Sequence, residues 1–142
     1  MAAIGSTSSE LAWQRWREAP EEALRLAREA EASLRECLEV RRRILPPDHW
    51  LLVNTRNLAG VVAALIVRVD GNLSPGEREA RFAGLERELV ETAEAIERHP
   101  GIPAQFREER IRKARERVAL LYEAWGKPAE AERWRRRTKV SP

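Results

Sequence analysis

Apolar residues recur every three or four positions through most of the chain, which is the spacing of an amphipathic α-helix. β-Branched residues gather in one short stretch, and aromatic residues make up only 6% of the chain, a composition that disfavours strands. The pattern therefore predicts an all-α fold. The longest apolar stripe, over residues 20–45, consists of Ala23, Ala27, Ala30, Leu34, Cys37 or Leu38, and Ile44.

Clusters of proline, glycine and small polar residues interrupt this pattern at residues 46–47, 70–76, 100–103 and 126–128. A short helix is also predicted over residues 9–19, where Ser8 or Ser9 can cap it. Residues 1–8 and 138–142 are predicted to be flexible tails, which leaves residues 9–137 as one helical domain. The five main helices are predicted over residues 20–45, 49–69, 75–98, 103–125 and 128–137.

Several helix ends carry residues that suit the unpaired backbone groups found there. Glu77 follows Ser74 by three positions, which is the spacing of a capping box. Asp48 is predicted to cap the helix that starts at residue 49. Gly126 is predicted to form the C-terminal cap of the helix over residues 103–125.

The composition suits a folded protein with exposed helix faces rather than a disordered chain. Of its 142 residues, 35% are charged and 43% are hydrophobic. The formal net charge is +3, and basic and acidic residues are interleaved along nearly the whole sequence. So small an excess of positive charge does not indicate a nucleic-acid-binding protein.

Three features bear on the cellular compartment. Cys37 is the single cysteine, so an internal disulfide cannot form, which fits a reducing environment. The first ten residues lack the charged start and long apolar run of a signal peptide. The longest apolar run, residues 61–67, is too short to span a bilayer. We therefore expect a cytoplasmic protein.

The last two predicted helices carry the pattern A-x-L-Y-x-x-x-G-K-x-x-E-A-E, from Ala119 to Glu132. This segment resembles the helix–turn–helix unit of the tetratricopeptide-repeat family. The resemblance implies that Ala119 and Ala131 lie where the two helices touch. It also implies that Gly126 makes the turn and that Tyr122 fills the space between repeats.

A second segment, residues 29–49, resembles the repeats of kinesin light chains, in which a long second helix ends in a short turn with an Asp-His pair. Here that pair is Asp48-His49. Together with residues 99–103 and 121–127, this segment is similar to the repeat arrays that follow bacterial serine/threonine kinase domains. The chain itself contains no kinase motif, so kinase activity is not implied.

The resemblance covers residues 29–137 and implies a definite architecture. We expect antiparallel helix pairs stacked as a short, degenerate tetratricopeptide-like array. The array is degenerate because Ala59 and Ala119, at equivalent places in successive repeats, lie further apart than the usual period of about 34 residues.

The resemblance also implies a binding function, since arrays of this family bind partners on the surface lined by the first helix of each pair. In this chain those helices are residues 49–69 and 103–125. We expect a protein–protein interaction module, a scaffold or docking domain that holds a partner segment in this groove, and not an enzyme. Asn can pair with a peptide backbone, and Arg or Lys with carboxylates. The predicted groove residues are Asn54, Asn57, Val61, Arg110, Lys113 and Arg117.

The alternative is a closed helical bundle with an internal pocket for a small molecule or a simple, even engineered, catalytic activity. Such a pocket needs a titratable group inside it, and the sequence places none there. His49 and His99 both fall at turns without a second ligand at metal spacing, so a structural role is predicted for them. No catalytic, cofactor-binding or metal-binding residues are predicted. The residues that could line the pocket are Trp13, Trp16, Trp50 and Trp125.

One dense basic cluster lies near the C-terminus. It could contact nucleic-acid phosphate or a membrane surface, or it could simply be a favourable positive end on the last helix. Because a short array exposes apolar surface at its ends, a homo-oligomer is a further alternative. The cluster consists of Arg133, Trp134, Arg135, Arg136 and Arg137.

Overall fold

The structure, a computed structural model, describes residues 2–139, and this part of the chain contains helices and turns but no strand. The all-α prediction is therefore confirmed, and all four predicted breaks separate helices. The helices are α1 (Ala2–Arg15), α2 (Pro20–Ile44), α3 (Trp50–Val69), α4 (Pro75–Arg98), α5 (Ala104–Trp125) and α6 (Pro128–Lys139).

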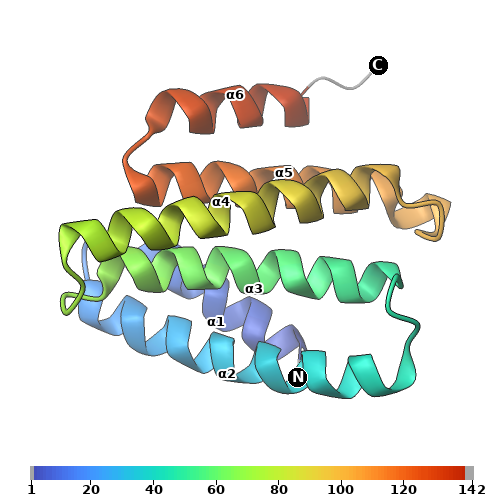
Figure 1. The fold of residues 1–142 in the computed structure, drawn as a ribbon, viewed down its shortest axis with the longest axis horizontal. Coiled ribbons are helices and arrows are strands. Elements are labelled where there is room, and N and C mark those ends of the chain that lie inside the picture. The colour runs from blue at the N-terminus through green and yellow to red at the C-terminus, as the bar shows by residue number, and fades with distance from the viewer. Residues whose placement is uncertain (1, 140–142) are drawn as a thin grey trace.

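Each helix packs against the next one along the chain, and α3 also packs against α5 and, less extensively, against α1 (Figure 1). Helix α3 is therefore the centre of the fold, with α2 and α4 in front of it in this view and α1 behind. Over the described residues, α2 and α4 do not pack against each other, and neither do α1 and α5. A hollow consequently borders α3 on each of its two sides.

The ends of the helices follow the local sequence signals. Ser74 and Glu77 form the predicted capping box, and Gly126 ends α5 with a left-handed φ of 80°. The predicted cap of α3 is wrong by one residue. His49, not Asp48, is the N-cap, because its Nδ1 accepts a hydrogen bond from the Leu51 amide at 3.1 Å.

The second histidine joins the two turns at one end of the molecule. Nδ1 of His99 accepts a hydrogen bond from the Gly101 amide at 2.9 Å, so the proton of the neutral ring resides on Nε2. Nε2 then donates to the Asp48 carbonyl oxygen at 2.6 Å. This hydrogen bond links the α4–α5 turn to the α2–α3 turn. Both histidines thus hold turns together, as the sequence predicted.

Helix α1 differs most from its prediction. It begins at Ala2, inside the segment predicted to be a flexible tail over residues 1–8, and ends at Arg15 rather than residue 19. The chain turns there because the Arg15 carbonyl accepts hydrogen bonds from the amides of Glu18 and Ala19. At the other end of the chain, α6 continues to Lys139, whereas a tail was predicted from residue 138; residues 140–142 lie outside the described part.

The core is built around α3, whose buried positions include Val61, Ala64 and Leu65. By length and composition alone α3 could cross a membrane, although residues 61–67 by themselves are too short to do so. However, 61% of its apolar window is buried inside the fold, which is what the central helix of a packed core requires. Cys37 and Ala30 are also buried, as predicted from the apolar stripe of α2, but Ile44 at the end of that stripe is exposed, so the stripe leaves the core before the helix ends.

Candidate functional site: a groove between α1, α3 and α5

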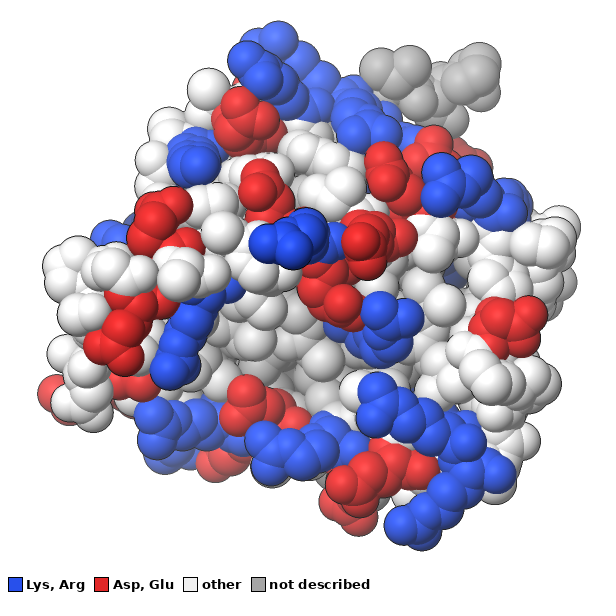
Figure 2. Space-filling view, in the orientation of Figure 1, with Lys and Arg blue, Asp and Glu red and all other residues white. Residues whose placement is uncertain are grey.

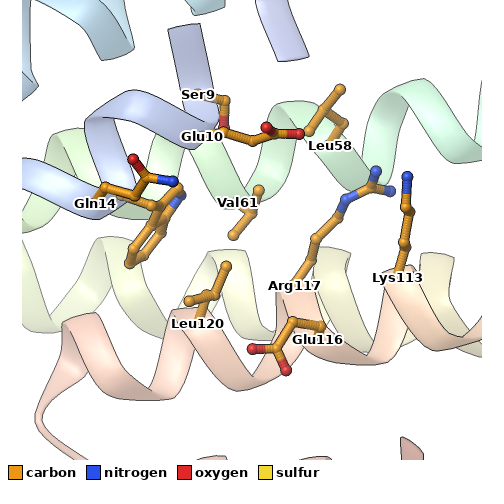
Figure 3. Close-up of a pocket in the computed structure, with 10 residues that line it drawn as sticks. Ser9, Glu10, Gln14, Leu58, Val61, Lys113, Glu116, Arg117 and Leu120 are labelled. Atoms are coloured by element: carbon orange, nitrogen blue, oxygen red, sulfur yellow. The ribbon is translucent and has the colours of Figure 1, made fainter. Parts of the chain in front are cut away.

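A hollow lies between α1 and α5, with α3 as its floor (Figure 3). Its volume is about 370 Å³, and it is partly open to solvent. The groove exists because α1 and α5 both pack beside α3 without meeting. Its lining residues are Ser9, Glu10, Trp13 and Gln14 from α1, Leu58 and Val61 from α3, and Lys113, Glu116, Arg117 and Leu120 from α5.

Arg117 is the central polar residue of this groove. It rises from α5 toward α3, where its Nη1 donates to Asn54 Oδ1 at 3.1 Å and to Asn57 Oδ1 at 3.2 Å (Figure 3). The two asparagines are three residues apart on α3, so they project from the same face of the helix. Together they hold the guanidinium in one position at the floor of the groove.

Asn57 is anchored in turn by α4. Its side chain is completely buried, and Nδ2 donates to Thr92 Oγ1 at 2.8 Å and to the Leu89 carbonyl at 3.4 Å. Thr92 Oγ1 donates to the Glu88 carbonyl of its own helix at 2.8 Å. A chain of hydrogen bonds therefore runs from α4 through α3 to Arg117 on α5, and such a satisfied buried network fixes the geometry of its members.

The charge of Arg117 has no counterpart among the described residues, because none of their carboxylates forms an ion pair with it. Burial, with a smaller contribution from the neighbouring Arg110 charge, lowers the pKa of Arg117 to about 10. Both effects disfavour the cation, yet at pH 7 it remains charged. A cation in a groove, with a lowered pKa and no carboxylate partner, is a candidate binding group.

Two further cations lie on the same helix. Lys113 lines the groove one turn before Arg117, and it pairs with Glu109 at 3.2 Å on the exposed side. Arg110 lies beyond the groove lining, with its guanidinium 5.6 Å from the ring centre of Trp50. Its Nε is buried without a hydrogen-bond partner. This end of the groove is therefore positively charged.

The α1 wall has a different character. Ser9, Glu10 and Gln14 supply polar groups, and the ring of Trp13 supplies an apolar surface. Glu10 is exposed and forms no ion pair with another described residue. An occupant of the groove would thus meet Lys113, Arg117 and the Arg135-bonded Glu116 on the α5 side, and the carboxylate of Glu10 on the α1 side.

The predicted basic cluster on α6 is largely neutralised by neighbouring carboxylates. Trp134 is buried in the core, so it cannot stack on a base. Arg135 lies between two carboxylates of α5, bonding Glu116 at 3.1 Å and Glu123 as well. The other three arginines face carboxylates too: Arg133 pairs with Glu130 at 3.0 Å, Arg136 with Glu132 at 3.6 Å and Arg137 with Glu97 at 4.0 Å.

The four tryptophans considered for an internal pocket do not share one. Trp13 lines the groove, whereas Trp16 is partly buried against the core, with the guanidinium of Arg17 4.5 Å from its ring centre. Trp50 stacks on His49 at the turn end of α3, and Trp125 stacks on Phe82. They therefore lie at four separate places in the fold.

The structure brings only half of the predicted groove residues to the groove surface, namely Val61, Lys113 and Arg117. Asn54 and Asn57 support Arg117 from behind, and a partner cannot reach Asn57 because it is completely buried. On the α1 wall, Trp13 was predicted only for the alternative internal pocket, because the resemblance assigned the groove to the helices over residues 49–69 and 103–125. Glu10 and Gln14 carried no signal in the sequence, since exposed polar residues occur on every helix of this chain.

A scan against protein-family models found no match, and searches of curated proteins and of solved structures found none either. Among the described residues, no group of three or more His, Cys, Asp or Glu side chains is placed to hold a metal ion. The groove is therefore the feature of the chain that bears most directly on its function.

Proposed function

We propose that this chain is a protein-interaction module that docks an acidic segment of a partner protein in the groove between α1, α3 and α5. The observation that carries the proposal is Arg117, a desolvated guanidinium that two asparagines hold in place and that has no carboxylate partner among the described residues. A carboxylate from the partner would supply the missing counter-charge, through a charge-assisted hydrogen bond.

The apolar lining supports a segment of polypeptide as the occupant. Leu58, Val61 and Leu120 lie beside the cations, and the ring of Trp13 faces them from α1. An acidic residue at Arg117 with an apolar neighbour would therefore contact both kinds of surface at once. Buried aromatic anchors beside a charged group are common where one protein binds another.

The arrangement of the hairpins supports the same proposal. We propose that α1–α2, α3–α4 and α5–α6 form a short, degenerate tetratricopeptide-like array in a cytoplasmic protein. The first helix of each hairpin then contributes to the groove, as in the family that the sequence resembles. The buried alanines Ala119 and Ala131 and the turn at Gly126 fit that pattern.

The test is a selection from a displayed library of random peptides, followed by fluorescence polarisation with the selected sequences. The expected consensus contains an acidic residue next to an apolar one. Lys113→Glu reverses a charge at the groove and should weaken binding by at least about tenfold, or ~1.4 kcal/mol. Lys113 is exposed, so the variant should fold normally.

Arg112→Glu is the matched control, because Arg112 is exposed on the same helix but lies outside the groove lining. It should retain full affinity for the selected peptides. Equal weakening by both variants would show that only the overall charge matters. If no peptide is selected and a small molecule instead raises the melting temperature, the closed-pocket hypothesis is favoured.

A further inference from the structure

We infer that the second hollow beside α3 is a self-association site, which receives the end of α2 from another copy of this chain. The hollow lies between α2 and α4, and Figure 2 shows it as an uncharged depression between two rows of charged side chains. Its volume is about 330 Å³. The lining consists of Ala63, Ile66 and Val67 of α3, Gly84 and Leu85 of α4, and Glu31 and Arg81 at the rims.

The hollow has room for aliphatic side chains, and its floor is apolar. Ile66 and Leu85 are only partly buried although they pack against the core. Gly84 adds to the space, since a Cβ atom placed there meets nothing within 4 Å. An apolar floor with an open gap above it is therefore available to an inserted side chain.

The same molecule carries an apolar projection elsewhere. Ile44 is 72% exposed and Val40 is 46% exposed, which makes them the two most exposed large hydrophobic residues in the described part of the chain. They are four residues apart at the end of α2, so they stand one above the other on a single helix face. Branched aliphatic side chains of this kind suit the hollow beside α3.

One charge beside the projection is complementary to one charge at the rim of the hollow. Glu36 lies one turn before Val40 on the same face of α2, is exposed, and forms no ion pair with any described residue. Arg81 at the rim of the hollow is also exposed and also lacks an ion pair within the described chain. Insertion of Val40 and Ile44 brings the Glu36 carboxylate to the side of the Arg81 guanidinium, whose charge otherwise acts on Glu77 one turn before it on α4.

The projection and the hollow lie on different parts of one chain, so the contact is head-to-tail. A head-to-tail contact leaves one unused projection and one unused hollow on each pair of chains, and growth continues unless a ring closes. The α1–α3–α5 groove lies on the opposite side of α3 and is not involved. The inference therefore stands independently of the proposed docking function.

The experiment is sedimentation velocity of the full chain from about 5 µM to about 1 mM, a range suited to an interface of modest area. The wild-type mass should rise with concentration from that of one 16.3 kDa chain past that of two. Ile44→Glu removes the projection and Gly84→Leu fills the hollow. Each variant alone should raise the apparent dissociation constant at least about tenfold.

Mixing the two variants gives the decisive result. Ile44→Glu retains an intact hollow and Gly84→Leu retains an intact projection, so an equimolar mixture should form a complex of two chains and stop there. Gly76→Leu is the matched control, because Gly76 is also on α4 and also has open space beside it, but it lies outside the hollow. That variant should associate like the wild type.

Both test positions tolerate substitution, since Ile44 is exposed and Gly84 faces open space. Circular dichroism should confirm unchanged helicity for each variant. A wild-type chain that stays monomeric to about 1 mM would overturn the inference. So would variants that associate as strongly as the wild type, or a mixture that remains monomeric.

Discussion

Arg117 in the groove and the arginines of α6 are two basic regions of one molecule, and they differ in what faces them. The α6 arginines are dense in the sequence, yet each has a carboxylate within 4.0 Å. Arg117 ends an equally basic stretch of α5, residues 110–117, yet it has only asparagine oxygens as partners among the described residues. The number of basic residues in a segment therefore does not predict which of them lack a carboxylate partner.

The difference arises from which helices meet. Helix α6 packs on α5, whose facing side supplies Glu116 and Glu123 to Arg135. Arg117 points the other way, toward α3, whose nearest polar side chains are Asn54 and Asn57. One side of α5 therefore supplies carboxylates to the arginine of α6, whereas the other side carries a cation that pairs with no carboxylate of the described residues.

The strongest test of this comparison is Asn57→Ala, which removes the support of Arg117. We expect a loss of about 2–4 kcal/mol in the free energy of unfolding, because the buried guanidinium loses one of its acceptors, Thr92 loses a donor and a cavity forms. Asn54→Ala is the control, since Asn54 is only partly buried and bonds only Arg117; about 1 kcal/mol or less is expected. Both are measured by urea unfolding, and equal losses would contradict the buried network.

The sequence predicted the helices well because their limits are encoded locally. The breaks at Pro46–Pro47 and Asp70–Gly76 need no tertiary contact, and the cap at Ser74 uses residues three positions apart. Helix α1 was predicted less accurately, since small residues over 2–8 gave no apolar period. The local signal for a helix was weak in that segment. In the structure α1 packs against α2, a tertiary contact that the sequence pattern did not show.

The site was predicted less well because it depends on long-range pairs. Helical spacing correctly placed Asn54 and Asn57 on one face, but it could not show that this face meets Thr92 of α4. In the same way, the sequence showed Arg135 within a basic run but could not show that carboxylates of α5 pair with it. Periodicity identifies faces, whereas their partners follow only from the arrangement of helices.

A second prediction concerns the neutralised side of α5. Arg135→Gln leaves Glu116 and Glu123 without their shared cation, so we expect about 1–2 kcal/mol less stability at pH 7, between the values for exposed and buried pairs. Arg112→Gln, an exposed change on α5, should cost less than about 0.5 kcal/mol. If Arg135→Gln lowers the free energy of unfolding no more than Arg112→Gln does, the ion pairs between Arg135 and the α5 carboxylates contribute nothing to stability.

Lowering the pH should reduce the difference in stability between the wild type and Arg135→Gln. Burial raises the pKa of Glu123, but hydrogen bonds from Arg135 and Arg17 outweigh burial and leave the folded-state pKa below the usual value. A carboxyl with a lowered folded-state pKa stabilises the fold above its ordinary pKa and loses that contribution as pH falls through the lowered value. Urea unfolding from pH 7 to below the usual Glu range should therefore show wild type and Arg135→Gln converging. Parallel curves would contradict the assignment.

The smallest effects are expected at the exposed end of α6. Arg133 and Arg136 pair with carboxylates three or four residues earlier on their own helix, and their side chains are 69% and 73% exposed. Water and salt screen such pairs, and ordering two long side chains offsets much of the attraction, so Arg133→Ala and Arg136→Ala should each change stability by less than about 0.5 kcal/mol. Neither substitution should change the affinity for the selected peptides, because both residues lie outside the groove. Weak binding to a nonspecific DNA duplex should fall slightly and should vanish on adding salt. If Arg133→Ala or Arg136→Ala instead abolished peptide binding while Lys113→Glu preserved it, α6 would be the working surface and the groove would not.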